Sequence, residues 1–117
     1  MNRQIKFRGK RLDNDEWVYG DLIHIDDSDI GIVTDYDHWQ GCRVDPETVG
    51  QFTGMIDKNG KEICEGDIVE MGKYTGEVRW MPGKCCFQLS PGGVFLSRNC
   101  TVLGNIYDGY KLNENKE

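Results

Sequence analysis

His38 stands among residues of the kinds that hydrolytic enzymes use. Asp35 and Asp37 precede it, and Cys42 follows four positions later. A carboxylate can orient a histidine that acts as a general base, and a cysteine beside such a base can act as a nucleophile. Asp37, His38 and Cys42 therefore define one hypothesis, a small hydrolase. We favour the alternative, a polar loop packed over Trp39, because neighbours in sequence need not converge in space.

Two cofactor-binding motifs are incomplete in this chain. Residues 66–74 hold two glycines and a lysine, as a phosphate-binding loop does. Five residues separate the glycines, however, and Tyr74 stands where that loop needs Ser or Thr. Three pairs of aspartates have the spacing that opens a calcium-binding EF-hand loop, but all three lack its glycine and its closing glutamate. We therefore expect these acids to serve in turns, with no cofactor and no metal.

The five cysteines follow neither a metal-binding nor a disulfide pattern. Their number is odd, two are adjacent, and no Cys-x-x-Cys pair occurs. No stretch joins basic residues to a long apolar run, as a signal peptide or a membrane span would. We therefore expect free thiols in a cytoplasmic protein that does not enter a membrane. The cysteines are Cys42, Cys64, Cys85, Cys86 and Cys100.

The net charge of −6 disfavours nucleic acid and membrane surfaces as partners, but the charges are unevenly distributed. Five cations precede the first acid, and residues 12–42 then hold nine acids without Lys or Arg. With an aromatic loop, the cations make a candidate binding surface for nucleic acid or an acidic partner. The alternative is that the basic strand pairs with the acidic strand beside it. The candidate surface comprises Arg3, Lys6, Arg8, Lys10, Arg11, Tyr36, His38 and Trp39.

Short alternating stretches in the first half predict the strands that carry these residues. Residues 4–8 alternate, which places Ile5 and Phe7 inward and leaves Lys6 and Arg8 facing solvent. Aromatic and β-branched residues dominate two further stretches, 16–23 and 30–34, as is typical of strands.

The second half repeats this sequence of strands and turns. Asn59-Gly60 predicts a hairpin turn with φ > 0 at both central residues. In residues 75–80, alternation places Val78 and Trp80 on the inner face, so we expect Trp80 to pack in the core. Tyr74, Arg79 and Trp80 are also of the kinds that stack on single-stranded bases, which is the alternative.

Helical patterning is almost absent. Pro46 after Asp45 predicts one helical turn over residues 46–48, with the aspartate as its cap. Longer stretches keep no period of about 3.6 residues, and fifteen glycines among short strands favour a curled sheet. The sequence thus predicts an all-β chain. We expect a single domain, 1–117, with an N-terminal half 1–56, a C-terminal half 57–107 and a polar tail 108–117.

Several motifs resemble those of the YopX family, small proteins carried by bacteriophages and prophages. They follow the family's order over nearly the whole chain, with Phe52 and Cys64 as mild departures from the usual residues. The motifs are Ile5-Lys6-Phe7-Arg8, Trp17-Val18-Tyr19-Gly20, Glu47-Thr48-Val49-Gly50-Gln51-Phe52-Thr53-Gly54, Asp57-Lys58-Asn59-Gly60-Lys61-Glu62-Ile63, Glu65-Gly66-Asp67-Ile68-Val69 and Leu103-Gly104-Asn105-Ile106-Tyr107.

The resemblance implies a short-stranded pseudo-barrel whose C-terminal half is similar to an SH3-like barrel. It also implies an origin in a phage or prophage of a bacterial host. It implies no activity, because the family has no settled biochemical function.

The function we expect is that of a non-enzymatic protein-binding module that self-associates as a homo-oligomer. The all-β pattern, the acidic charge and the incomplete catalytic motifs favour it. A nucleic-acid-binding module using the basic N-terminal strand is the alternative, and the hydrolase ranks below both.

Overall fold

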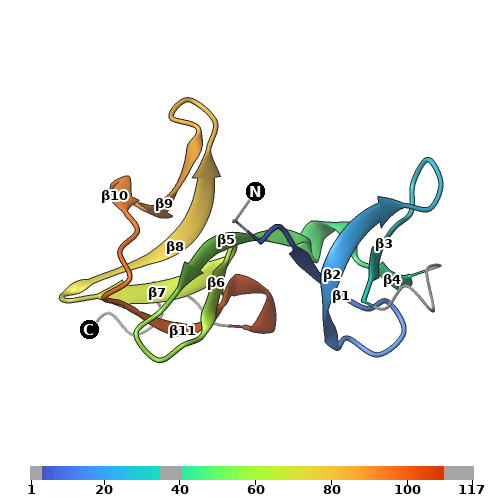
Figure 1. The fold of residues 1–117 in the computed structure, drawn as a ribbon, viewed down its shortest axis with the longest axis horizontal. Helices are drawn as coiled ribbons and strands as arrows, with labels where there is room; N and C mark the ends of the chain where they lie inside the picture. Colours follow the sequence, from blue (N-terminus) through green and yellow to red (C-terminus); the bar gives the residue numbers. More distant parts are fainter. Residues whose placement is uncertain (1–3, 35–40, 110–117) are drawn as a thin grey trace. The chain divides into compact units, whose positions relative to one another are not determined.

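The computed structural model describes residues 4–34 and 41–109. Over these residues the chain is all-β, as predicted: antiparallel strands form two sheets, with two short 3₁₀ turns (Figure 1). Both sheets are open within the described part of the chain, since each strand order has two ends. The chain divides into two compact units, the first unit (Met1–Phe52) and the second unit (Thr53–Glu117).

The first unit is built from successive antiparallel neighbours. Its buried apolar residues include Ile32, Val33 and Val44. Their side chains are β-branched and come from the unit's third and fourth strands. Such side chains pack well on the pleated surface of a sheet. The strands are β1 (Phe7–Lys10), β2 (Trp17–His24), β3 (Ile30–Val33) and β4 (Cys42–Val44), each paired with the next.

The helical turn predicted over residues 46–48 is confirmed as η2 (Pro46–Thr48). The Asp45 side chain caps it by accepting a hydrogen bond from the Glu47 N–H at 3.0 Å. The Thr48 hydroxyl donates to the Asp45 carbonyl at 2.7 Å and accepts from the Lys10 N–H at 2.9 Å. This turn therefore anchors the end of β1 to the chain that follows β4.

Strand β5 (Gly50–Ile56) runs from the first unit into the second. Gly50 and Gln51 pair with β1, whereas the Thr53 hydroxyl donates to the Ile63 carbonyl of β6 (Glu62–Cys64) at 2.8 Å. The resulting strand order is β4-β3-β2-β1-β5-β6.

The second unit contains a five-stranded sheet around a core of Ile63, Val69, Val78, Leu89 and Cys100. All five residues are at most 1% exposed. The sheet order is β10-β9-β8-β7-β11. The strands are β7 (Asp67–Met71), β8 (Tyr74–Met81), β9 (Cys86–Ser90), β10 (Val94–Phe95) and β11 (Thr101–Asn105), and η3 (Ile106–Asp108) follows the last.

The prediction that Ile5 points inward and Arg8 faces solvent is wrong. Arg8 is only 4% exposed, whereas Ile5 is 42% exposed. The Arg8 guanidinium lies over the Trp17 ring, with Cζ 4.6 Å from the ring centroid. A flat, weakly hydrated guanidinium can be buried against an aromatic face, which strand alternation does not take into account.

The prediction that Trp80 packs in the core is also wrong, since its side chain is 45% exposed. Val78, on the same face of β8, is fully buried and pairs with Leu89. Trp80 pairs with Phe87 nearer the hairpin end and meets its ring edge-on at 5.1 Å. The strand therefore keeps its alternation but extends beyond the core.

The hairpin at Asn59-Gly60 is confirmed, but its predicted turn type is wrong. Gly60 has φ of +85°, whereas among the described residues other than glycine only Asp15 and Cys85 have positive φ. The Gly60 N–H donates to the Asp57 carbonyl at 3.0 Å, and the Asp57 N–H to the Lys61 carbonyl at 2.8 Å. This pattern is typical of a three-residue loop in which glycine alone takes the left-handed conformation.

Candidate functional site

The basic strand of the first unit lies against aromatic rings of that unit. Arg8 and Lys10 both lie over Trp17, the Lys10 Nζ being 5.6 Å from the ring centroid. The Lys6 Nζ lies 5.5 Å from the centroid of Phe52. Three of the predicted cations therefore contact aromatic rings of their own unit, and these contacts stabilise that unit.

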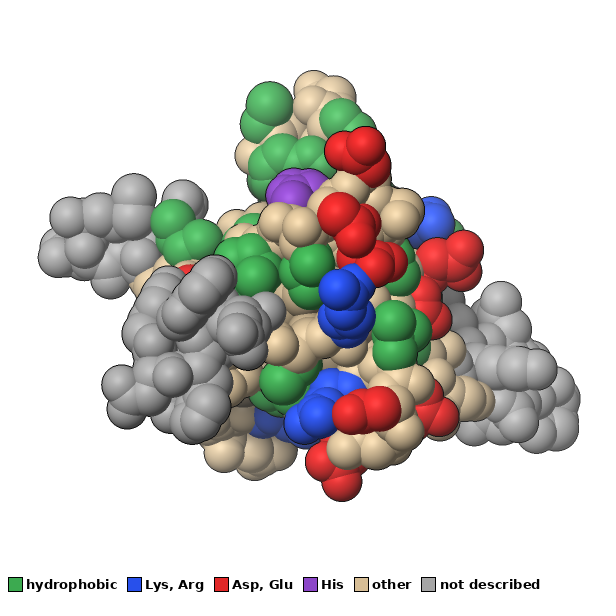
Figure 2. Space-filling view, turned by 90° about the vertical axis from the view of Figure 1, so that its right-hand side faces the viewer, with side chains coloured by type: hydrophobic (Ala, Val, Ile, Leu, Met, Phe, Trp, Pro, Cys, Tyr) green, Lys and Arg blue, Asp and Glu red, His purple; other side chains and the backbone are tan. Residues whose placement is uncertain are grey.

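Arg11 is engaged within the first unit as well. Its Nε and Nη2 donate to the two carboxylate oxygens of Asp13 at 3.0 and 2.8 Å. This hydrogen-bonded pair raises the pKa of Arg11 and lowers the pKa of Asp13. Figure 2 shows Lys and Arg side chains beside acidic and apolar ones on the face that it presents. The other predicted surface residues, Arg3, Tyr36, His38 and Trp39, lie outside the described residues.

The proposed hydrolase residues are not brought together by anything the structure describes. Asp37 and His38 lie outside the described residues, and Cys42 is half-buried at the start of β4. In the second unit, Cys64 and Cys100 are buried, and burial raises the pKa of the Cys100 thiol. A raised thiol pKa disfavours the reactive thiolate, so Cys100 serves as core packing.

The Asp57 carboxylate organises the hairpin that the sequence motifs mark most strongly. It is 4% exposed and accepts the N–H groups of Asn59 at 2.9 Å, Lys61 at 2.8 Å and Val102 at 3.0 Å. These bonds hold the pKa of Asp57 below its ordinary value, with Val102 making the largest contribution, although burial opposes the shift. This motif is therefore a structural link between the hairpin and β11.

The next motif is also a turn. The Asp67 carboxylate accepts the Cys64 N–H at 2.8 Å, and Gly66 between them has φ of +93°. A Cβ at Gly66 would lie 2.8 Å from Cε2 of Tyr107, so the ring rests directly against the glycine backbone. The Asn105 side chain accepts the Tyr107 N–H at 2.9 Å and so fixes η3 beside this turn. Two polar caps and one glycine thus position the Tyr107 ring.

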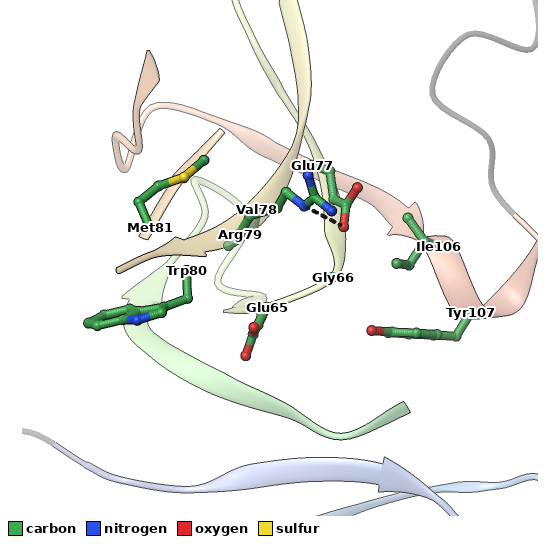
Figure 3. A pocket seen from close by; sticks show the side chains of 9 residues that line it. All are labelled: Glu65, Gly66, Glu77, Val78, Arg79, Trp80, Met81, Ile106 and Tyr107. Atoms are coloured by element: carbon green, nitrogen blue, oxygen red, sulfur yellow. Dashed lines mark ion pairs between the residues drawn. The ribbon is translucent and has the colours of Figure 1, made fainter. Parts of the chain in front are cut away.

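An open cavity of about 350 Å³ lies beside the Tyr107 ring, entirely within the second unit. Such a volume falls toward the lower end of sites that hold small ligands, roughly 300–1,000 Å³. Figure 3 shows the Trp80 and Tyr107 rings with the Glu65 carboxylate between them in this view. Its lining residues are Glu65, Gly66, Glu77, Val78, Arg79, Trp80, Met81, Ile106 and Tyr107.

The lining of the cavity contains more acidic than basic side chains. The lining contains two carboxylates, Glu65 and Glu77, and one guanidinium, Arg79. The Arg79 Nε lies 3.7 Å from the Glu77 Oε2, and Arg79 is 58% exposed, so this is a loose surface pair. In Figure 3 the pair lies on the far side of Gly66 from the Glu65 carboxylate. In this view the aromatic rings and the Glu65 carboxylate therefore lie at one end of the cavity and the Glu77–Arg79 pair at the other.

Sequence reasoning found only part of this cavity. Arg79 and Trp80 belong to the alternative stacking surface that the sequence suggests, but the third residue of that surface, Tyr74, does not line the cavity. Glu65, Ile106 and Tyr107 were missed as site residues. Their signal was the two family motifs that end at Val69 and Tyr107, because the first supplies the glycine against which the second places its ring.

Metal-binding and membrane-spanning features can be assessed over residues 4–34 and 41–109, which the structure describes. That part of the chain contains no group of three or more His, Cys, Asp or Glu side chains suited to hold a metal ion. It also has no helix long and apolar enough to cross a membrane.

Comparisons with known proteins agree with the sequence motifs. A profile of the family described as YopX protein matches residues 6–112. The crystal structure of protein EF1440 from Enterococcus faecalis is similar, with a TM-score of 0.57 and 21% sequence identity. The match covers 92% of this chain and 96% of that one, and it shows a shared fold. A comparison with curated proteins found no match.

Proposed function

Since the chain belongs to the YopX family, whose profile matches residues 6–112, we propose that it is a non-enzymatic protein-binding module. The observation that carries this proposal is Trp80, which is 45% exposed on the wall of the open cavity. We also propose that the protein originates from a bacteriophage or prophage, as the family resemblance implies.

The residue types around the cavity support protein binding. Tryptophan, tyrosine and arginine dominate the energetic centres of protein interfaces, and all three line this cavity as Trp80, Tyr107 and Arg79. Ile106, which is 37% exposed, adds apolar surface beside them. Partial exposure of large side chains costs solvation free energy, which contact with a partner would recover.

Self-association is the second part of the proposal, and the β10 edge supports it. β10 is the end of its sheet order, and its Phe95 is 70% exposed. An exposed edge strand with an apolar side chain can pair with the same edge of a second copy. We also propose that the five-stranded sheet is an opened relative of an SH3-like barrel, because β8 curves strongly along its length in Figure 1.

Two variants test the two parts separately. Trp80→Ala and Phe95→Ala each remove one exposed aromatic from the second unit. We expect Trp80→Ala to reduce partner capture from a lysate of the bacterial host, while Phe95→Ala retains it. We expect light scattering behind a sizing column to show an oligomer for the wild type and a smaller species for Phe95→Ala.

Each of the two parts of the proposal, partner binding and self-association, can fail without the other. Equal capture by wild type and Trp80→Ala would contradict the cavity as the binding site. A monomeric wild type at high protein concentration would contradict self-association. Nucleic-acid binding remains the alternative prediction, with less support because Arg8 is buried and Arg11 is paired with Asp13. It predicts a mobility shift at low salt that salt abolishes.

A further inference from the structure

We propose that Asn59 is a site of spontaneous deamidation, and that the Asp57 carboxylate controls its rate by holding the surrounding loop closed. The modification converts a neutral amide of the β5–β6 hairpin into a carboxylate. It goes beyond the protein-binding function and does not depend on it.

The loop that joins β5 to β6 leaves the reacting groups accessible (Figure 1). Asn59 and Gly60 are both exposed. A Cβ built on Gly60 would meet nothing within 4 Å, so water and hydroxide can reach the loop. Among the described residues, the Asn59 side chain makes no hydrogen bond, and only its backbone N–H does. The side-chain amide is therefore free to react.

The reaction joins the backbone nitrogen of Gly60 to Cγ of Asn59. The Gly60 amide gives its proton to hydroxide, its nitrogen bonds to Cγ, and the bond from Cγ to Nδ2 breaks and releases ammonia. Water then opens the resulting succinimide ring. Attack at Cγ yields aspartate, whereas attack at the backbone carbonyl yields isoaspartate, whose chain runs through Cβ and Cγ. The net reaction consumes water and leaves an acidic residue and ammonia, with no change in oxidation state.

The closed loop opposes this reaction. Ring closure requires the Gly60 nitrogen to lose its proton and approach Asn59, but this N–H donates to the Asp57 carbonyl at 3.0 Å. The Asp57 carboxylate also accepts the N–H groups on either side of Gly60, those of Asn59 at 2.9 Å and Lys61 at 2.8 Å. The ring therefore forms from the opened loop, and the population of that state depends on the Asp57 bonds.

The isoaspartate product would weaken the hairpin. It inserts an additional backbone carbon before Gly60, which shifts the Gly60 and Lys61 N–H groups away from Asp57. The same Asp57 carboxylate accepts the Val102 N–H of β11 at 3.0 Å. Deamidation therefore loosens the link between the hairpin and β11.

The experiment is a time course of the intact protein in warm, mildly alkaline buffer. Peptide mapping by mass spectrometry measures asparagine, aspartate and isoaspartate at each position. Asn14 and Asn99 are comparators within the chain, since both are exposed but precede residues with side chains, Asp15 and Cys100. In protein unfolded by guanidinium chloride, we expect Asn59 to react about tenfold faster than either comparator, because glycine hinders ring closure least.

The effect of the loop is measured in the folded protein. We expect Asn59 to react at least about tenfold more slowly in folded than in unfolded wild type, and Asp57→Ala to recover most of this rate. Asp26→Ala is the matched control, because it removes an exposed turn aspartate that accepts the N–H groups of Ser28 and Asp29. It should leave the Asn59 rate unchanged. If Asp57→Ala does not fold, Asp57→Asn replaces it and should raise the rate about threefold.

The stability of aged protein gives a second measurement. Aged wild type should unfold at a lower urea concentration than fresh protein. Asn59→Gln should keep its midpoint through the same incubation, because its longer side chain closes a ring more slowly.

Each part of the proposal can be overturned. Reaction of Asn14 or Asn99 as fast as Asn59 in unfolded protein would overturn Asn59 as the site. Equal Asn59 rates in folded and unfolded wild type, or in wild type and the Asp57 variant, would overturn control by Asp57. An equal loss of stability in aged wild type and aged Asn59→Gln would overturn the effect on the hairpin.

Discussion

The two units place their described tryptophans, Trp17 and Trp80, in opposite settings. In the first unit, the Trp17 ring is covered by the cations of Arg8 and Lys10. In the second unit, Trp80 meets only the edge of Phe87 among the aromatic and cation contacts found in the described residues, and it stays 45% exposed. Both tryptophans lie on strands, β2 and β8, with alternating patterns.

This difference shows that residue type alone does not make a binding surface. The basic and aromatic residues of the first unit satisfy one another, and their interaction stabilises the fold. In the second unit, the carboxylates of Asp57 and Asp67 hold the turns instead. The Trp80 ring has no part in these turns and lines an open cavity. A cluster of cations in sequence is therefore weaker evidence for a site than one exposed tryptophan.

The largest expected effect tests whether carboxylates in turns hold the second unit. Asp57→Ala should lower the free energy of unfolding by about 2–4 kcal/mol, because three backbone donors lose an ionised acceptor. Urea denaturation measures it. The control is Asp26→Ala, which removes an exposed turn aspartate that accepts the N–H groups of Ser28 and Asp29. A loss as large for Asp26→Ala would contradict the special role of Asp57.

The pH dependence of stability tests the same residue without removing its side chain. Because the pKa of Asp57 is lower in the folded protein than in the unfolded chain, its contribution is complete above the ordinary pKa of about 3.9. That contribution is lost as the pH falls through the folded pKa. Asp57→Asn should therefore show a smaller loss of stability on acidification than the wild type, as measured by urea midpoints. Parallel curves for the two proteins would contradict the assignment.

The next largest effect on stability is expected at Trp17, whose ring is covered by cations. Trp17→Ala should cost about 2–3 kcal/mol, because a half-buried ring is lost and the buried Arg8 guanidinium loses its aromatic face. Trp17→Phe keeps a ring under the cations and should recover most of this loss. If the two variants unfold at the same urea concentration, the ring–cation contacts contribute little.

The smallest effect on stability belongs to the exposed tryptophan. Trp80→Ala should cost about 1 kcal/mol, mainly for the lost edge contact with Phe87. The same variant should reduce partner capture, so stability and binding would respond in opposite ways to changes at Trp17 and Trp80. A loss of stability as large as that of Trp17→Ala would instead make Trp80 a core residue.

Much of the fold could be predicted because its signals are local. Strand alternation, the capped turn at Pro46 and the hairpin at Gly60 depend on residues a few positions apart. The turn type at Asn59 could not be predicted from that pair alone, since the Asp57 side chain accepts the amides of Asn59 and Lys61 and favours a different loop. The cavity could not be predicted either, because its residues come from a turn, a strand and η3.

By itself, the sequence determined the all-β class, the positions of the turns and the family, since each is encoded in short motifs. Only the tertiary structure decided that Arg8 is buried and Trp80 is exposed. The physical reason is that alternation assigns a side chain to one face of a strand, whereas burial depends on what covers that face. For Arg8 the cover is Trp17 of the neighbouring strand, and for Trp80 the buried core ends at Val78.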